Sequence, residues 1–195
     1  MKITSKISLA LLPILLALAV LSLLVYPSLE SSMSQSIGSK HLIVLQNLMG
    51  QIDWILYKRA ADIQLVAREE VFIDHLMGKN RKEHDPPQKI KDLLDISGPW
   101  DALTLADKSA TIRLASDERL LGGRLDQNPE EALALRQALK GSVYSSDLVV
   151  SRQTGRPTII FAAPGLGYAP DHAIQGAVIG HFSWPVILEF IEETR

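Results

Sequence analysis

Twenty consecutive residues, Ile7 to Tyr26, contain no charged side chain and follow closely behind Lys2 and Lys6. An apolar helix of about 20 residues spans the roughly 30 Å hydrocarbon core of a bilayer. Lysines beside such a segment favour the cytoplasmic side. The sequence therefore predicts a cytoplasmic N-terminus (residues 1–6) and a single transmembrane anchor (residues 7–26) in the inner (plasma) membrane. Residues 27–195 are then expected to be periplasmic or extracellular.

A cleaved signal peptide is the alternative interpretation of this apolar run. Signal peptides have an apolar stretch of about 7–15 residues that ends at a small-x-small cleavage site. Here the stretch is longer, and the sequence Tyr26-Pro-Ser-Leu-Glu-Ser-Ser32 follows it without an A-x-A site. We therefore favour an uncleaved anchor.

Composition limits what the remaining 169 residues (27–195) can form. They suffice for one domain plus an extended element, because domains cluster near about 100–150 residues. The absence of cysteine excludes disulfides, thiolate metal sites and a cysteine nucleophile. Removing Lys2 and Lys6 from the 20 basic residues leaves 18 against 22 acidic residues, a net charge of −4. This balance offers no basic surface for nucleic acid.

A long segment without proline follows the anchor. From Glu30 to Met77, apolar residues recur with helical spacing. At about 1.5 Å per residue, one uninterrupted helix over this segment would reach roughly 70 Å. Its apolar stripe can cover a core or pair with a second copy of the helix, so we expect a homodimer interface within residues 27–78. The stripe consists of Leu45, Leu48, Ile52, Ile55, Leu56, Ile63 and Val66.

The pattern changes after Pro86-Pro87, which can open a short helix predicted over residues 88–96. Beyond it, five short strand-like segments are separated by turns. A helix interrupts them after the second segment, where Asn128 caps it, Pro129 takes its first position and Gly141 ends it. The predicted strands cover residues 101–106, 110–115, 142–151, 157–163 and 173–183, and a last helix covers residues 184–194.

The order of these segments predicts an α+β fold. A long extracytoplasmic helix is followed, over residues 79–195, by a PAS-like five-stranded antiparallel sheet with flanking helices. The chain thereby resembles the extracellular Cache sensor domains of bacterial chemoreceptors, sensor histidine kinases and membrane-bound cyclases, and the likeness covers roughly residues 27–195. The fragments that carry the resemblance are Arg59-Ala-Ala-Asp62, Leu105-Ala-Asp107, Thr111-Ile-Arg-Leu-Ala-Ser116, Gly141-Ser-Val-Tyr-Ser-Ser-Asp147, Ser151-Arg-Gln-Thr-Gly-Arg-Pro157, Ile160-Phe-Ala-Ala-Pro164 and Gly176-Ala-Val-Ile-Gly180.

The resemblance implies a ligand-sensing input module of a transmembrane receptor, of chemoreceptor or sensor-kinase type. A small molecule would bind between the sheet and its covering loops, and the change would pass along helices through the membrane. Neither catalysis nor a cofactor is implied. The chain ends at Arg195 without an output module. Two accounts remain open: the front part of a larger receptor, or a single-pass binding protein that works through a partner.

The last predicted strand supplies the proposed floor of the ligand pocket. Gly176, Val178, Gly180 and Phe182 share one face of it, and the two glycines are expected to leave room above that face. Amino-acid-binding members of the family usually carry an aspartate where this chain has Phe182. An amino-acid ligand is therefore not supported. Because the proposed pocket contains no charged constellation, a small acid or an apolar molecule is favoured over a cationic one. The complete set of predicted ligand contacts is Tyr144, Asp147, Phe161, Gly176, Val178, Gly180, Phe182 and Arg113.

Other residues have a structural interpretation that competes with a functional one. Arg59 and Asp62, three residues apart on a helix, are predicted to form a structural ion pair. His181 alternates onto the face opposite Gly180, and we expect it on the surface. For Asp147, a solvated position on an edge strand competes with contact to a ligand, because an unpaired buried carboxylate is costly.

Motifs for catalysis and metal binding are missing. No G-x-S-x-G, H-E-x-x-H, P-loop or spaced G-x-G-x-x-G occurs. The glutamate pairs 69–70, 130–131 and 192–193 are predicted to lie on solvated helix faces. His84-Asp85 and Asp171-His172 have no further ligands at suitable spacing. The remaining alternative to a sensor is a membrane-anchored protein-docking module, which predicts an exposed apolar patch and no enclosed cavity.

Overall fold

The structure is a computed structural model that describes residues 42–193, except residues 80, 82–84, 97, 169 and 171. The predicted N-terminal segment and anchor (residues 1–6 and 7–26) lie outside the described residues. Within the described part, no helix is long and apolar enough to cross a membrane. The chain divides into two compact units, Met1–Gln51 and Ile52–Arg195. Of the first unit, residues 42–51 are described, and they are helical.

The long helix runs through residues 42–67, and its predicted start at Glu30 lies outside the described residues. It does not continue to Met77. Glu69 has an extended backbone (φ −60°, ψ 126°), and a separate helix, α2 (Glu70–Leu76), begins after it. The prediction of one uninterrupted helix up to Met77 is therefore wrong.

The break has a simple physical reason. In a straight helix with 3.6 residues per turn, the nine residues from Ile63 to Phe72 turn through about 900°, which would put the two side chains on opposite sides. The change of direction at Glu69 lets both side chains enter the same core cluster, where both are fully buried. Burying a phenylalanine stabilises the fold by about 1.5–3 kcal/mol, which is comparable to the net cost of a few lost hydrogen bonds. Part of that cost is avoided, because the backbone N–H groups of Arg68 and Glu69 donate to the carbonyls of Leu65 and Val66.

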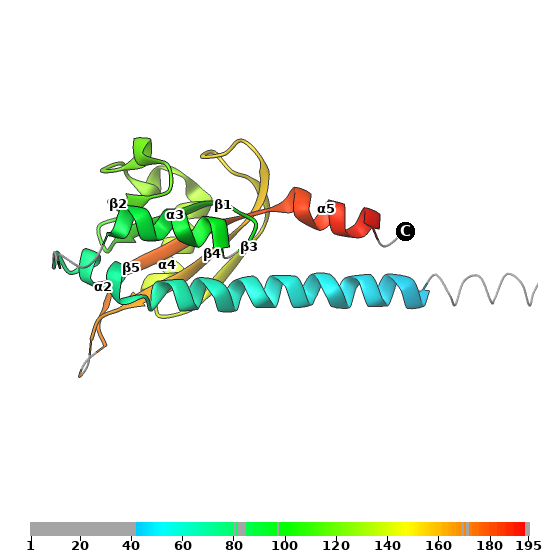
Figure 1. Cartoon of the computed structure of the whole chain (residues 1–195), viewed down its shortest axis with the longest axis horizontal. Coiled ribbons are helices and arrows are strands. Elements are labelled where there is room, and N and C mark those ends of the chain that lie inside the picture. Colours follow the sequence, from blue (N-terminus) through cyan, green and yellow to red (C-terminus); the bar gives the residue numbers. More distant parts are fainter. Residues whose placement is uncertain are drawn as a thin grey trace, which may run out of the picture. The chain divides into compact units, whose positions relative to one another are not determined.

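Five antiparallel strands form one sheet in the order β2-β1-β5-β4-β3 (Figure 1). The predicted number and orientation of the strands are confirmed. The strands are β1 (Trp100–Asp107), β2 (Ile112–Ala115), β3 (Tyr144–Val150), β4 (Pro157–Leu166) and β5 (Ile174–Ser183). β5 lies in the centre, between β1 and β4, and is buried along most of its length. This position explains its nearly continuous apolar sequence.

The predicted helical insertion after the second strand is also confirmed. It contains two short 3₁₀ helices, η1 (Glu118–Leu120) and η2 (Leu125–Gln127), and then α4 (Pro129–Leu139). The side chain of Asn128 caps α4, because its Oδ1 accepts a hydrogen bond of 3.2 Å from the backbone N–H of Glu130. Two further helices, α3 (Pro86–Ile96) and α5 (Trp184–Glu193), complete the described domain.

Two different cores cover the two faces of the sheet. The helix-side face of the sheet packs against residues 52–67 of the long helix, α2, α3 and α5 (Figure 1). The α4-side face is the opposite one, which packs against α4. The helix-side core contains large residues, among them Phe72, Trp100, Leu103, Leu105, Phe161, Val178 and Phe182. The α4-side core is rich in alanine, and includes Ala106, Ala110, Ala115, Ala134, Ala138, Ala162 and Ala177.

Candidate functional site

The predicted pocket floor belongs to the helix-side core. Phe182 is completely buried there. The room expected above the glycines is filled. A Cβ atom on Gly180 would lie 2.6 Å from the ring of Trp100, and one on Gly176 would clash with the backbone oxygen of Ala106 and lie 2.9 Å from the side chain of Leu76. The two glycines thus permit close packing of Trp100 and α2 on β5. Whether this face contacts a ligand stays a prediction.

Aromatic rings close the helix-side face. Trp100, Phe161 and Phe182 pack edge to face, with ring centroids 5.9–6.3 Å apart. The guanidinium of Arg59 lies about 6 Å from the centroids of the Trp100 and Phe182 rings, and its Nη1 is 3.2 Å from Oδ2 of Asp62. The predicted ion pair is therefore present within the long helix. The contacts of the Arg59 guanidinium with the two rings connect this helix to the aromatic cluster.

The other predicted contacts lie elsewhere. Tyr144 is half-buried beside the α4-side core, and burial, with the nearby charges of Glu130 and Asp147, raises its pKa. Asp147 is exposed on the edge strand β3, the solvated position that competed with ligand contact. Arg113 is exposed and pairs with Asp107 at 2.8 Å. The structure brings together the residues of β4 and β5 on the helix-side face. It places Tyr144 against the opposite, α4-side core, and Asp147 and Arg113 on the exposed surface.

A cavity opens on the α4-side face, at the N-terminal end of α4 and beside the turn between β3 and β4. Its volume is about 210 Å³, which suits a small molecule rather than a drug-sized one. Most of the lining residues have polar side chains, although apolar atoms form the larger part of the cavity surface; the lining consists of Ile112, Leu120, Arg124, Gln127, Asn128, Glu131, Arg152 and Gln153.

A larger groove of about 370 Å³ runs between the long helix and α3. Its polar lining includes Arg59 and Asp62, which already pair with each other. The groove therefore offers fewer uncommitted polar groups than the cavity on the α4-side face. We take the smaller cavity as the candidate site.

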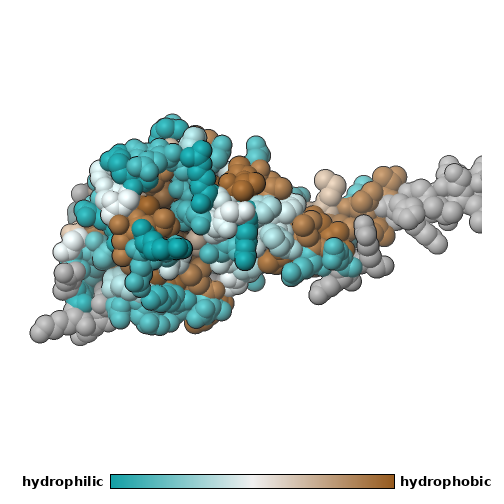
Figure 2. All heavy atoms as spheres, turned by 90° about the horizontal axis from the view of Figure 1, so that it is seen from above, coloured by the Kyte–Doolittle hydropathy of each residue, from teal (hydrophilic) through white to brown (hydrophobic). Residues whose placement is uncertain are grey.

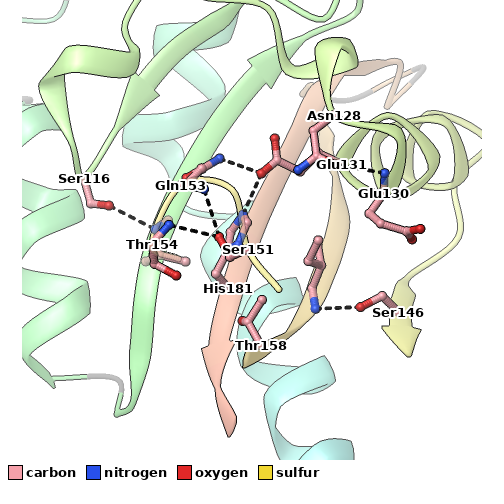
Figure 3. Close-up of polar contacts among 12 residues, drawn as sticks. Ser116, Asn128, Glu130, Glu131, Ser146, Ser151, Gln153, Thr154, Thr158 and His181 are labelled. Atoms are coloured by element: carbon pink, nitrogen blue, oxygen red, sulfur yellow. Dashed lines mark hydrogen bonds and ion pairs between the residues drawn. The ribbon is translucent and has the colours of Figure 1, made fainter. Parts of the chain in front are cut away.

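The α4-side cavity adjoins a buried polar cluster formed by Glu131, His181 and Gln153 (Figure 3). The side chain of His181 is 0% exposed and that of Glu131 is 5% exposed, and Nε2 of His181 lies 3.2 Å from Oε1 of Glu131. The side-chain amide of Gln153 donates a hydrogen bond of 2.9 Å to the same oxygen. The expected surface position of His181 and the expected solvated position of Glu131 are therefore both wrong.

The sequence contained a signal for each of these two residues. Glu131 precedes Leu135 by four residues and Ala138 by seven, so it lies on the apolar stripe of α4. His181 stands within the apolar run of β5, and a central strand of this kind is buried on both faces. A polar residue inside an apolar stripe or run is expected to have a buried partner.

The turn between β3 and β4 positions Gln153. Oγ of Ser151 accepts hydrogen bonds from the backbone N–H groups of Gln153 (3.1 Å) and Thr154 (3.2 Å), and Gly155 supplies a positive φ of 70° (Figure 3). Among the described residues, Oε1 of Gln153 and both ring nitrogens of His181 are buried without a hydrogen-bond partner, although Nε2 of His181 lies within ion-pair distance of Glu131. The cluster therefore has hydrogen-bonding capacity that the domain itself does not use.

No family model matches the chain, and no curated protein matches it. Solved structures do match. The sensor domain of the V. cholerae histidine kinase DctB aligns with a TM-score of 0.65 and 16% identity, covering 80% of this chain and 59% of that domain. The sensory domain of the Campylobacter jejuni chemoreceptor Tlp3 with isoleucine bound aligns with a TM-score of 0.62 and 12% identity, covering 85% of this chain and 66% of that domain. The E. coli DcuS sensor domain aligns with a TM-score of 0.53 and 14% identity, covering 72% of this chain and 96% of that domain.

This chain has the fold of a Cache-type, PAS-like sensor domain. At these identities the likeness concerns the fold alone. The chain spans about three fifths of the DctB domain and two thirds of the Tlp3 domain, but nearly the whole of the DcuS domain. In this Cache-type fold, no group of three or more His, Cys, Asp or Glu side chains among the described residues is placed to hold a metal ion.

Proposed function

We propose that this chain is the extracytoplasmic ligand-sensing input domain of a transmembrane signal-transduction receptor, of chemoreceptor or sensor-kinase type. Residues 7–26 would anchor it once in the inner membrane, and residues 27–195 would be periplasmic or extracellular. The observation that carries this proposal is the α4-side cavity beside the buried cluster of Glu131, His181 and Gln153. It occurs on a fold shared with sensor domains of DctB, DcuS and Tlp3.

The energetics of the cluster support a ligand. A buried pair of polar or charged side chains is often no more stabilising than apolar residues of similar size, because both groups lose their hydration. Folding alone therefore gives little reason for a carboxylate and an imidazole at these positions. A cavity with a few fixed polar groups is, in contrast, how small-molecule sites are usually built. The Tlp3 sensory domain, which shares this fold, has been solved with isoleucine and with L-valine bound.

The helix-side floor is a second candidate site in the same domain. Gly176, Val178, Gly180, Phe182 and Phe161 would contact the ligand there. Because Trp100 and Leu76 occupy the space above the glycines, such a ligand would have to displace them. The α4-side cavity needs no such rearrangement, and we rank it first.

A homodimer through the long helix is part of the proposal. Within the compact unit, Trp54, Tyr57 and Leu65 are 63%, 69% and 66% exposed and lie on one side of the helix. The rings of Trp54 and Tyr57 stack with centroids 6.0 Å apart. Figure 2 shows apolar patches interrupting a largely hydrophilic surface. The exposed side chains of Trp54, Tyr57 and Leu65 also favour the second candidate function, a protein-docking module that acts through a partner.

A thermal-shift screen tests the proposed function. The full chain in detergent would be heated with small acids, amino acids, purines and amines. A compound that binds only the native state raises the melting temperature in a saturable way, by an amount that follows RT ln(1 + [L]/Kd). We expect such a rise with one chemical class. Arg152→Gln, at an exposed position that lines the α4-side cavity, then separates the two candidate sites, because a ligand bound on the helix-side face would still raise the melting temperature of this variant. If no class shifts a folded protein, the docking module replaces the sensor.

A further inference from the structure

The sheet has two outer edges, and they differ in what covers them. At the β2 edge, the backbone N–H of Ile112 donates to the carbonyl of Gly123, and the N–H of Gly122 donates to the carbonyl of Ile112. The insertion after β2 therefore takes the place of a further strand. At the other edge, β3 pairs with β4, and no segment of the described chain pairs with its outer side (Figure 1).

The hydrogen-bond pattern shows which backbone groups of β3 point outward. The N–H of Ser151 donates to the carbonyl of Arg156, so this residue faces β4. In an antiparallel pair, the backbone groups of successive residues point alternately toward the neighbouring strand and away from it. Leu148 and Val150 therefore direct their N–H and C=O groups outward. Pro157 lies opposite Val150, which agrees with this assignment because proline has no N–H to donate.

The side chains of the same two residues are apolar and exposed. Leu148 is 48% exposed and Val150 is 67% exposed. Val149, between them, packs against the α4-side core, so Leu148 and Val150 share the helix-side face. Unpaired backbone groups beside exposed apolar side chains favour pairing with another strand. The first half of β3 is better protected, because it contains a bulge after Ser145 and the exposed charge of Asp147.

We propose that residues 148–150 of β3 are a docking site for a partner protein, which adds an extended segment to the sheet as a further strand. The backbone of this segment pairs with the outward N–H and C=O groups of Leu148 and Val150. Apolar side chains two residues apart on the segment lie beside the same two side chains. None of residues 148–150 lines the α4-side cavity, so the inference does not depend on where a ligand binds.

Charges at the two ends of this docking site select the segment that fits. Asp147 is exposed at one end, and Arg152 is exposed at the other. Neither has an ion-pair partner among the residues that the structure describes. An antiparallel segment is therefore expected to carry an acidic residue near its N-terminal end, beside Arg152, and a basic residue near its C-terminal end, beside Asp147.

A second copy of the chain fits this edge less well than a different protein. Antiparallel pairing of two β3 strands needs a twofold axis perpendicular to the sheet. Residues 52–67 of the long helix pack on one face of the sheet and so run along it, and this axis would reverse their direction between the copies. The proposed anchors of the two copies would then point away from each other and could not enter the same membrane.

A designed hexapeptide tests this inference on the full chain in detergent. Its sequence is Glu-Thr-Val-Thr-Val-Lys, with blocked ends and a fluorescent label, and binding is measured by fluorescence anisotropy. Methylating the backbone nitrogens of its two valines removes the N–H groups that would face Leu148 and Val150. Methylating its two threonine nitrogens changes groups that face away from β3. We expect the valine-methylated peptide to bind at least about tenfold more weakly than the other two peptides.

Two variants locate the docking site. Val150→Lys places a charge on the apolar side of the edge and is expected to weaken peptide binding at least about tenfold. Its melting temperature should equal that of the wild type, because the side chain is 67% exposed. Leu121→Lys, at a position 46% exposed in the insertion after β2, is the matched control and should bind the peptide as the wild type does.

Four results would overturn the inference. The first is that the unmodified peptide does not bind. The second is equal binding of the two methylated peptides, which would exclude backbone pairing. The third is an equal loss of binding in Val150→Lys and Leu121→Lys, which would place the contact elsewhere. The fourth is self-association of the chain in sedimentation experiments that Val150→Lys abolishes, because the edge would then be occupied by a second copy.

Discussion

The helix-side and α4-side faces of the sheet share the same five strands but are built from opposite kinds of side chain. On the helix side, three aromatic rings and several branched residues fill the space, and even the glycines of β5 are covered by Trp100 and Leu76. On the α4 side, the packing residues are mostly alanine, and a carboxylate, an imidazole and an amide lie buried beside an open cavity.

This difference suggests a division of roles. Large apolar side chains contribute most of the free energy of burial, so the helix-side face is the main source of stability. Alanine contributes little, and the buried polar groups of the α4 side contribute less still after the cost of desolvation. That face is therefore less stable and better suited to rearrange when a ligand binds. The following variants compare the two faces, from the largest expected effect to the smallest.

Phe182→Ala tests the helix-side face. Truncating this fully buried ring leaves a cavity between Trp100 and Phe161, and we expect the free energy of unfolding to fall by about 3–5 kcal/mol. Urea denaturation followed by circular dichroism measures the change. Leu188→Ala, which removes a side chain 48% exposed on α5, is the control and is expected to change stability by no more than about 0.5 kcal/mol. Equal effects of the two variants would contradict the proposed role of this face.

Replacing Glu131 and His181 tests the buried pair on the α4 side. Glu131→Leu or His181→Leu alone leaves the other group without its partner, and each is expected to lower the free energy of unfolding by about 1–3 kcal/mol. Because the double variant removes both polar groups, its loss should be smaller than the sum of the two single losses. A double-mutant cycle in urea measures this difference. Strict additivity would show that the two side chains are not coupled.

Asn128→Ala tests the cap of α4, which holds Glu131 at its place in the first turn. Losing the hydrogen bond to the backbone of Glu130 is expected to cost about 1 kcal/mol of stability. Asn128→Asp should restore most of it, since aspartate caps helices equally well. Thermal unfolding of both variants provides the test, and a loss in Asn128→Asp as large as in Asn128→Ala would count against the capping role.

Asp107→Asn tests the turn between β1 and β2. Of the variants compared here, it is expected to have the smallest effect on stability. Partial burial raises the pKa of Asp107, but hydrogen bonds from Ser109 and Thr111 and the charge of Arg113 outweigh it, so the net pKa is lowered. A lowered folded-state pKa means that ionised Asp107 stabilises the fold above its unfolded pKa of about 3.9. That stabilisation is lost as the pH falls through the folded-state pKa.

The expected result is a lower melting temperature for Asp107→Asn at pH 7 and convergence with the wild type below about pH 4. Melting curves from pH 7 to pH 2 measure it. Asp95→Asn, at an exposed position on α3, is the control. A difference that stays constant over the whole pH range would exclude the charge of Asp107 as its cause.

The sequence was sufficient to predict most of the fold. Five strands, the insertion after the second strand and the cap at Asn128 all follow from local patterns of apolar residues and turn formers. The break at Glu69 did not, because apolar residues continue with helical spacing on both sides of it, and only the shared burial of Ile63 and Phe72 requires a change of direction. Local periodicity contains no information about such long-range packing.

The site was harder to predict than the fold. Alternation along β5 correctly predicted that His181 and Gly180 lie on opposite faces of the sheet. It could not predict which face would be buried, and in the structure both faces are buried. The space above a glycine depends on residues far away in the sequence, here Trp100 for Gly180. Glu131 meets His181 across 50 positions in the chain, and no spacing rule in one sequence connects two such residues.

Hydrogen–deuterium exchange with and without a compound that raises the melting temperature tests the central claim most directly. If the α4 side binds the ligand, backbone amides around Leu120–Glu131 and Ser151–Arg156 should exchange more slowly with ligand present, and residues 52–76 should change little. Protection confined to residues 52–76 and to β5, with no effect at the N-terminal end of α4, would place the ligand on the helix side and contradict this account.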